Sequence, residues 1–139
     1  MKKEIGITMT ILQQDLEELL LLINMNKQYL STLFLRLGLA FVFLYAGIAA
    51  FITPNNWVGF IPNIGNFITK AIILQIHVAV NVLLGLWLLS NKKIFYASSV
   101  SSVFLFGITI FNISQFDIIF RDVAILLSAL ALAVLTYEK

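Results

Sequence analysis

Four long apolar stretches constrain the fold of this chain more than any other feature of its sequence. They cover residues 33–52, 67–89, 95–113 and 118–137. A helix of about 20 residues crosses a hydrocarbon core of roughly 30 Å, so each stretch is long enough to span a bilayer. The last stretch must begin before the charged residues 121–122, because a later start would leave it too short. The sequence therefore predicts an all-α membrane protein built as a four-transmembrane-helix bundle.

The composition agrees with a membrane environment and argues against several other classes of protein. Hydrophobic residues make up 60% of the 139 positions and charged residues only 12%, whereas soluble domains are about half apolar and a quarter charged. A chain of this size cannot hide so much apolar surface in one core, so we expect it to contact the lipid bilayer. The net charge is +2, and the nine lysines and arginines are spread along the chain without forming a basic patch. This distribution argues against a nucleic-acid partner.

Several kinds of reactive site are missing from the sequence. The chain contains no cysteine and one histidine, which excludes disulfides and cysteine-ligated iron–sulfur clusters made by this chain alone. It has no pair of haem ligands, no carboxylate–histidine metal cluster, no phosphate loop and no nucleophile with a matching base. We therefore expect no metal, no built-in cofactor and no catalytic residue. A non-catalytic subunit is favoured over a self-contained enzyme.

The lysines and arginines predict the orientation of the helices. If four helices alternate, most positive residues fall on one side of the membrane and only Lys70 and Arg121 on the other. The side richer in lysine and arginine faces the cytoplasm. We predict a multi-pass protein of the cell membrane with both the N-terminus and the C-terminus cytoplasmic. The residues on the cytoplasmic side are Lys2, Lys3, Lys27, Arg36, Lys92, Lys93 and Lys139.

Residues 1–28 are predicted to form a separate amphipathic helix ahead of a transmembrane domain of residues 29–139. Apolar residues recur at helical spacing, and acidic and amide residues occupy the opposite face. Anionic lipid would repel the acidic face, so a partner protein or another part of the chain is an alternative to the bilayer surface. A further alternative is that translation starts at Met25. The apolar residues are Met9, Leu12, Leu16, Leu19 and Ile23.

Polar side chains lie along one face of the second apolar stretch. Lys70, His77, Asn81 and Gly85 are separated by seven, four and four residues, which places them on the same side of a helix. His77 would lie about 15 Å from the start of the helix, near the middle of the bilayer. An ionisable residue at that depth is costly and calls for an explanation. Its imidazole either exchanges a proton with a bound ligand or forms a hydrogen bond between helices.

The third stretch carries a stripe of small and hydroxyl residues. Such residues let helices pack closely, so packing is the first interpretation and a polar ligand cavity is the alternative. The stripe consists of Ser98, Ser102, Thr109 and Asn112, with Gly107 beside it.

Charged residues lie at the start of the fourth stretch and inside the first. Asp117 and Arg121 are four residues apart and Asp122 follows, an arrangement that either stabilises the helix start or belongs to a ligand site. Arg36 either reaches the headgroups or turns inward towards Asn81. The candidate ligand-binding residues are His77, Asn81, Asn112, Asp117, Arg121, Asp122 and Arg36.

The connection of residues 53–66 is the only long one, and it contains both prolines of the chain. A connection of this length is able to act as a lid or a binding loop. We favour a simpler role, in which Trp57 and Phe60 anchor the connection at the depth of the lipid headgroups.

Three segments of the chain resemble the DoxX family of small four-helix membrane proteins. They are RLGLAFVFLYAG at 36–47, GLWLL at 85–89 and FDIIFRDVAILLSALALAVL at 116–135. The resemblance covers the chain after the amphipathic segment and implies a four-helix bundle. The chain departs from the family pattern at Asn81, where an acid often stands, and at Ala50, where a lysine often stands.

Some DoxX members are subunits of quinone-linked oxidoreductases, including a thiosulfate:quinone enzyme, so the resemblance implies an oxidoreductase or sulfur-metabolism partner. We expect an accessory or quinone-binding subunit of a membrane oxidoreductase complex, with a quinone between the second, third and fourth helices. A small transporter that uses the same polar stripe is one alternative, and a non-catalytic membrane scaffold is another. The sequence leaves open the substrate, homo-oligomerisation and the passage of electrons.

Overall fold

Every regular element in the described part of the chain is helical. The computed structural model describes residues 2–61, 67–113 and 116–137. The predicted all-α fold is confirmed. The elements are the α-helices α1 (Lys2–Ile52), α2 (Phe67–Leu89), α3 (Ile94–Phe111) and α4 (Phe116–Thr136), with two short 3₁₀ helices, η1 (Pro54–Asn56) and η2 (Val58–Phe60), between α1 and α2.

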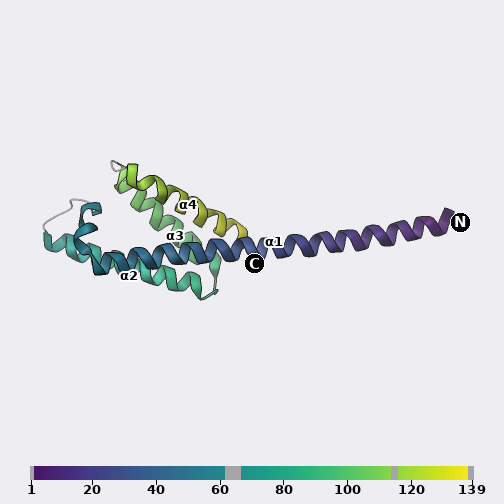
Figure 1. Ribbon diagram of the computed structural model, residues 1–139, viewed down its shortest axis with the longest axis horizontal. Helices are drawn as coiled ribbons and strands as arrows, with labels where there is room; N and C mark the ends of the chain where they lie inside the picture. Colours follow the sequence, from purple (N-terminus) through teal and green to yellow (C-terminus); the bar gives the residue numbers. More distant parts are fainter. Residues whose placement is uncertain (1, 62–66, 114–115, 138–139) are drawn as a thin grey trace. The chain divides into compact units, whose positions relative to one another are not determined.

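All four α-helices are long and apolar enough to cross a membrane. The spanning stretches are Gly6–Ile52 in α1, Thr69–Leu89 in α2, Ile94–Phe111 in α3 and Ile119–Thr136 in α4. By the length and composition of these helices the chain is a multi-pass integral membrane protein whose apolar surface contacts lipid. The predicted packing into a bundle is also confirmed. In Figure 1, α2, α3 and α4 lie beside the part of α1 that leads to its C-terminal end.

Three of the helices begin and end close to the predicted residues, whereas α1 is longer. α2 covers 67–89 as predicted, and α4 starts at Phe116, early enough to include the charged residues at its beginning. α1 is assigned as one helix from Lys2 to Ile52, whereas the sequence analysis expected two. Residues 24–33 contain neither glycine nor proline, so the polar run there does not interrupt the backbone hydrogen bonds.

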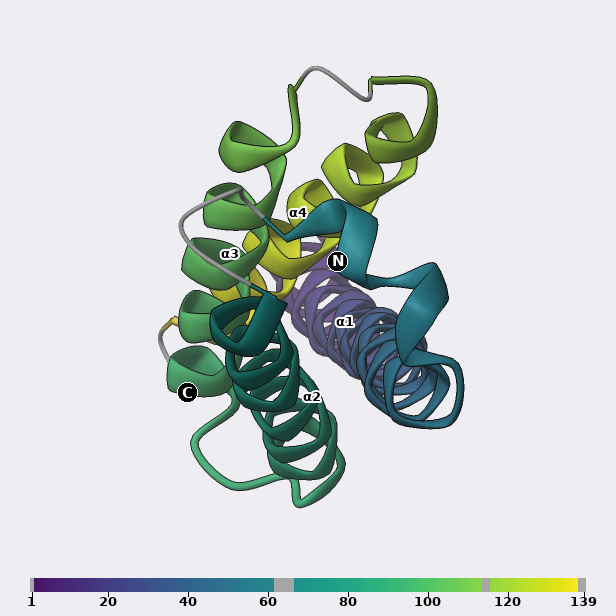
Figure 2. The same cartoon turned by 90° about the vertical axis from the view of Figure 1, so that its left-hand side faces the viewer.

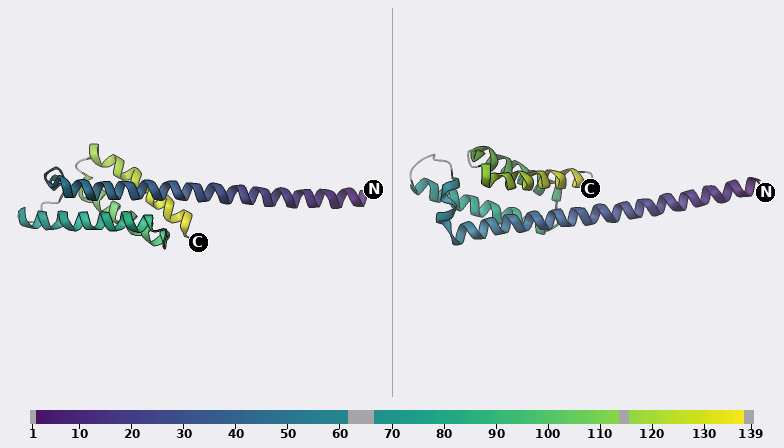
Figure 3. Two further views of the ribbon diagram at one scale, coloured as in Figure 1. Left: turned by 60° about the horizontal axis from the view of Figure 1, so that its bottom comes forward. Right: turned by 45° about the horizontal axis from the view of Figure 1, so that its top comes forward.

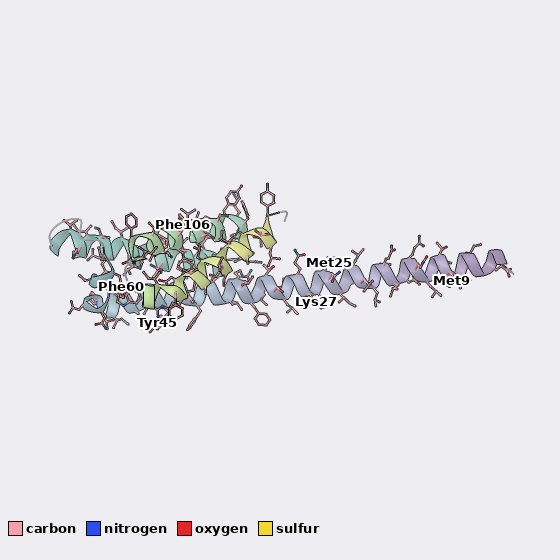
Figure 4. The ribbon with its side chains drawn as sticks, turned by 90° about the horizontal axis from the view of Figure 1, so that it is seen from above. Met9, Met25, Lys27, Tyr45, Phe60 and Phe106 are labelled. Atoms are coloured by element: carbon pink, nitrogen blue, oxygen red, sulfur yellow. The ribbon has the colours of Figure 1, made fainter. Side chains whose placement is uncertain are left out.

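The chain divides into two compact units, Met1–Leu33 and Phe34–Lys139. In the first unit every side chain from residue 6 to residue 31 is exposed. Figure 4 shows Met9, Met25 and Lys27 standing out from its helix. The second unit contains the bundle and has a core of its own.

Apolar side chains from all four helices form the core of the second unit. The end-on view in Figure 2 shows the helices arranged around this core. Phe43, Leu88 and Leu132 keep only 2%, 0% and 0% of their surface exposed. The cluster consists of Leu39, Ala40, Phe43, Leu84, Leu88, Ala97, Leu105, Ala129 and Leu132.

Two glycines allow α1 and α2 to approach closely, and Figure 3 shows α2 running alongside the second half of α1. A Cβ atom on Gly85 would lie 2.7 Å from Cγ of Leu44 and 3.2 Å from the carbonyl oxygen of Ala40. A Cβ atom on Gly47 would lie 2.8 Å from Cγ2 of Val82. Small residues bring helix backbones together in membranes because dispersion contacts drive helix association there.

Small residues also bring α3 close to α4, the most extensively packed pair of helices. Ala97, Ser98 and Ser101 of α3 are fully buried. The hydroxyl groups of Ser98 and Ser101 donate hydrogen bonds of 2.8 Å to carbonyl oxygens four residues earlier in the same helix. The hydroxyls are thereby satisfied without a partner from another helix, and the small side chains remain available for packing.

We predict that Gly85→Ala destabilises the bundle. The added methyl group meets the backbone of α1, and overpacking of this kind costs about 1–3 kcal/mol. Gly38→Ala is the matched control, because nothing lies within 4 Å of a Cβ atom at Gly38. The control should be neutral or slightly stabilising, by up to about 1 kcal/mol, since alanine is the better helix former. Denaturation in detergent micelles measures both, and equal stabilities for the two variants would contradict the close approach.

Candidate functional site

The second unit contains a cavity of about 800 Å³. All four helices and the segment around η2 contribute to its walls, at the end of the bundle that η1 and η2 cross (Figure 2). Small-molecule sites measure about 300–1,000 Å³ and combine an apolar lining with a few polar groups, so this cavity has a suitable size. The aromatic side chains of its lining are Phe41, Phe43, Tyr45, Trp57, Phe60, Phe104 and Phe111.

Five of the seven predicted site residues line this cavity. They come from separate helices: His77 and Asn81 from α2, Asn112 from the end of α3, and Arg121 and Asp122 from α4. From the sequence, these residues could be assigned to faces of separate helices, but their positions relative to one another could not be predicted. The structure brings these faces together and adds a wall from α1, which the sequence analysis did not expect.

His77 lies among aromatic rings in the wall of the cavity. Its ring centroid is 5.5 Å from that of Phe104 and 6.5 Å from that of Trp57. Phe104 in turn lies 6.5 Å from Phe43. Among the residues that the structure describes, neither ring nitrogen of His77 has a hydrogen-bond partner. The imidazole is therefore able to form hydrogen bonds with a molecule in the cavity.

Two buried carboxamides extend the polar part of the lining. Asn81 is 3% exposed and Asn112 is 8% exposed. The side-chain nitrogen of Asn81 donates to the carbonyl oxygen of His77 over 2.8 Å, and that of Asn112 donates to the carbonyl oxygen of Ile108 over 3.0 Å. A carboxamide has two N–H donors and one acceptor oxygen. Each side chain therefore keeps one donor and its oxygen for a ligand.

Charged residues of α4 lie at the edge of the cavity. Nε of Arg121 is 3.8 Å from Oδ1 of Asp122, and the two side chains are 64% and 23% exposed. An ion pair with this exposure contributes about 1 kcal/mol or less to stability. Asp117 lies in the first turn of α4, and its side chain is outside the described part of the chain. The predicted pairing of Asp117 with Arg121 therefore stays a prediction.

The lining of the cavity includes residues that are exposed on the surface of the bundle, from α1 and from α3. Phe41 and Tyr45 both line it, yet they are 71% and 64% exposed on the surface of the bundle. Their rings lie 6.3 Å apart, and Tyr45 lies at the same end of the bundle as Phe60 (Figure 4). Val103 and Phe111 of α3, which are 73% and 69% exposed, also belong to the lining, so a molecule dissolved in the hydrocarbon region would meet exposed lining residues of both helices.

Arg36 lies outside the cavity lining. Its Nη1 donates a hydrogen bond to Oδ1 of Asn91, in the turn between α2 and α3. Asn91 has a φ of 59°, in the left-handed region that asparagine adopts more readily than most residues. The indole N–H of Trp87 donates to the carbonyl oxygen of Lys92 in the same turn over 3.0 Å. Arg36 thus joins α1 to this turn and does not approach Asn81.

The sequence analysis missed the aromatic part of the site. The position of Trp57 at headgroup depth stays a prediction, and the structure adds that its half-buried indole lines the cavity, with its ring centroid 6.5 Å from that of His77. Phe43 and Phe104 gave no signal, because the chain contains 12 phenylalanines and the pattern does not separate cavity-facing rings from lipid-facing ones. Only the position of Trp57 in the long connection pointed to such a role.

Apart from those of Tyr45 and Trp57, the polar groups of the lining are few and come from three of the four helices. They offer one imidazole, two carboxamides and one carboxylate with its arginine. Across the described residues, no group of three histidine, aspartate or glutamate side chains could hold a metal ion.

No protein-family model, curated protein or solved structure matches the chain. The geometry of the cavity is therefore the basis for the function proposed below.

We predict that Arg36 and Asn91 are energetically coupled. Asn91→Gly keeps a residue that accepts a positive φ but removes the acceptor oxygen, and Arg36→Met removes the donor. Hydrogen bonds to charged groups contribute about 1.5–3 kcal/mol, so each variant should lose stability and the double variant should lose less than the sum. A double-mutant cycle in micelles measures the coupling, and strictly additive losses would contradict it.

Proposed function

We propose that this protein binds a lipid-soluble quinone in its cavity and acts as an accessory, quinone-binding subunit of a membrane oxidoreductase complex. The position of His77 carries the binding proposal. Its side chain lines a cavity walled by aromatic residues, and two carboxamides belong to the same lining. A quinone presents a flat apolar ring with carbonyl acceptors, which match stacking surfaces and N–H donors respectively.

Each polar residue of the lining has a role in this proposal. His77, Asn81 and Asn112 donate hydrogen bonds to the carbonyl oxygens of the ring, while Phe104 and Trp57 pack against its faces. Arg121 and Asp122 lie at the polar end of the lining, where they control entry, and the predicted share of Asp117 in this role stays a prediction. A quinone dissolved in the hydrocarbon phase enters the cavity past the exposed side chains of Phe41 and Tyr45.

The role as a subunit rests on the DoxX resemblance and on the residues that the sequence lacks. The chain supplies no cysteine and a single histidine, so electrons for a bound quinone would come from a partner protein. An oxidoreductase of sulfur metabolism is the partner that the resemblance implies. In this proposal the chain positions the quinone and the partner performs the redox chemistry.

The packing of the core favours a binding site over a small transporter. A permeation path needs a polar route through the whole bundle. Leu84, Leu88 and Leu132 lie in the apolar core outside the cavity lining and are 4%, 0% and 0% exposed. The presence of a cavity also favours a ligand-binding protein over a pure scaffold.

Fluorescence of Trp57 tests quinone binding. The chain has two tryptophans, and Trp87→Phe leaves Trp57 as the reporter in the cavity wall. A short-chain benzoquinone titrated into lipid nanodiscs should quench this fluorescence saturably. His77→Leu should weaken the apparent affinity about tenfold or more, since the loss of roughly 1.4 kcal/mol of hydrogen bonding corresponds to tenfold.

Two variants serve as controls for this measurement. Trp57→Phe leaves Trp87, whose quenching should rise linearly with the quinone dissolved in the lipid and should not saturate. Gln75→Leu makes a comparable polar-to-apolar change at an exposed position of α2 and should leave the affinity unchanged. Equal quenching curves for Trp57 and Trp87 would contradict the proposed binding of a quinone in the cavity.

We also propose that both termini lie in the cytoplasm, as the positive-inside rule predicts. A reporter enzyme that is active only in the cytoplasm should work when fused after Lys139. A reporter that needs export should be active only when inserted in the connection between α1 and α2. Activity of the exported reporter at the C-terminus would reverse the orientation.

A further inference from the structure

The first unit carries a heptad pattern that is apolar except at Asn26, and its side chains are exposed from Met9 to Leu30. Its apolar side chains follow one another in alternating steps of three and four residues, the spacing of a coiled-coil seam. The seam side chains Met9, Leu12, Leu16 and Leu19 are 57%, 57%, 58% and 57% exposed. The seam consists of Met9, Leu16, Ile23 and Leu30 at the a positions and Leu12, Leu19, Asn26 and Leu33 at the d positions.

We infer that this helix pairs with the same helix of a second copy of the chain, in a parallel, in-register coiled coil. Heptads sustained over about three to four repeats are a coiled-coil signal, and this seam repeats from Met9 to Leu33. The candidate span of α1 has 47 residues, about twice what a bilayer needs, and two copies with the same topology extend the same end of this helix on the same side of the membrane. Parallel pairing therefore needs no reversal of either chain.

Asn26 indicates that the partner is an identical helix. It is the one polar residue of the seam and lies at a d position, where burial against an apolar partner would leave its polar groups unpaired. In a parallel pair without register shift, the two Asn26 side chains meet and hydrogen-bond each other. Any shifted register would bury each of them against leucine and leave its polar groups unpaired.

The charges agree with self-pairing and disagree with a lipid surface. Glu17 and Glu18 occupy positions b and c, away from the seam. In a parallel pair Asp15 at g faces Leu20 at e of the partner helix, and Lys27 at e faces Leu22 at g, so no like charges oppose each other. Three acidic residues within four positions would be repelled by anionic lipid headgroups. A second copy is therefore the occupant that both the seam and the charges fit.

Cysteine cross-linking of the full-length chain in its own membranes tests this pairing. The chain has no cysteine, so each introduced residue reports alone. Leu12→Cys and Leu19→Cys lie in the seam, one heptad apart, and Ile11→Cys and Leu21→Cys are the matched controls off the seam. With a mild oxidant, both seam variants should form disulfide-linked homodimers in several-fold higher yield than both controls.

The remaining outcomes decide against the inference. Equal yields at seam and control positions, cross-linking at only one of the two seam positions, or linkage to a protein of different mass would each overturn the parallel homodimer. A second measurement does not depend on oxidation. Leu16→Asn with Leu19→Asn should convert full-length protein in nanodiscs or detergent to monomers by mass measurement, while Ile11→Asn with Leu21→Asn should leave the oligomer intact.

Discussion

Hydrocarbon offers no hydrogen-bond partner, and this constraint governs both the fold and the site. Each polar group in the bundle must find its partner within the protein. Ser98, Ser101 and Thr109 do so by donating to carbonyl oxygens four residues earlier in α3. The ring nitrogens of His77 form no such hydrogen bond among the described residues. His77, which lines the cavity, is thus one residue with unpaired polar groups, and Arg36, whose buried Nε has no partner among the described residues, is another.

Small residues lie between α1 and α2 and between α3 and α4, whereas bulky side chains lie between these two helix pairs. The cavity lies among the bulky side chains. Gly47 and Gly85 bring α1 onto α2, and buried serines and alanines bring α3 onto α4. Between these two close pairs, the core is filled by leucines on one side and bordered by aromatic rings on the other. Rigid rings such as Phe43 and Phe104 cannot collapse into the remaining space as flexible side chains would. The space is therefore kept open by the same residues that line it.

Much of the fold could be predicted from the sequence, because a membrane helix is encoded by the length of an apolar run. The ends of α2 and the early start of α4 followed from the thickness of the bilayer alone. The continuity of α1 could not be predicted from polarity. Polar residues such as Asn24 and Lys27 end an apolar stretch, but they do not end a helix. Polarity and helix-breaking are separate properties, and the sequence analysis treated them as one.

The candidate site could be predicted only in its polar half. An ionisable or amide side chain in an apolar run is conspicuous, so His77, Asn81 and Asn112 were identifiable from type and spacing. Arg36 was equally conspicuous, but its partner Asn91 lies 55 positions away in a turn, and no pattern of spacing reveals such a contact. The aromatic residues were hidden among many similar ones. Which ring faces lipid depends on how the helices rotate, and packing sets that rotation.

The polar residues of the lining would allow a site open to lipid to distinguish its ligand from the surrounding acyl chains. An acyl chain that entered past Phe41 and Tyr45 would fill the apolar volume but would leave His77 and the two asparagines unpaired. Each buried polar group left unpaired costs about 1–3 kcal/mol. A ring with carbonyl oxygens pairs these donors and gains the same stacking surface. Under the proposed function, selectivity therefore arises from the penalty on lipid more than from attraction to the quinone.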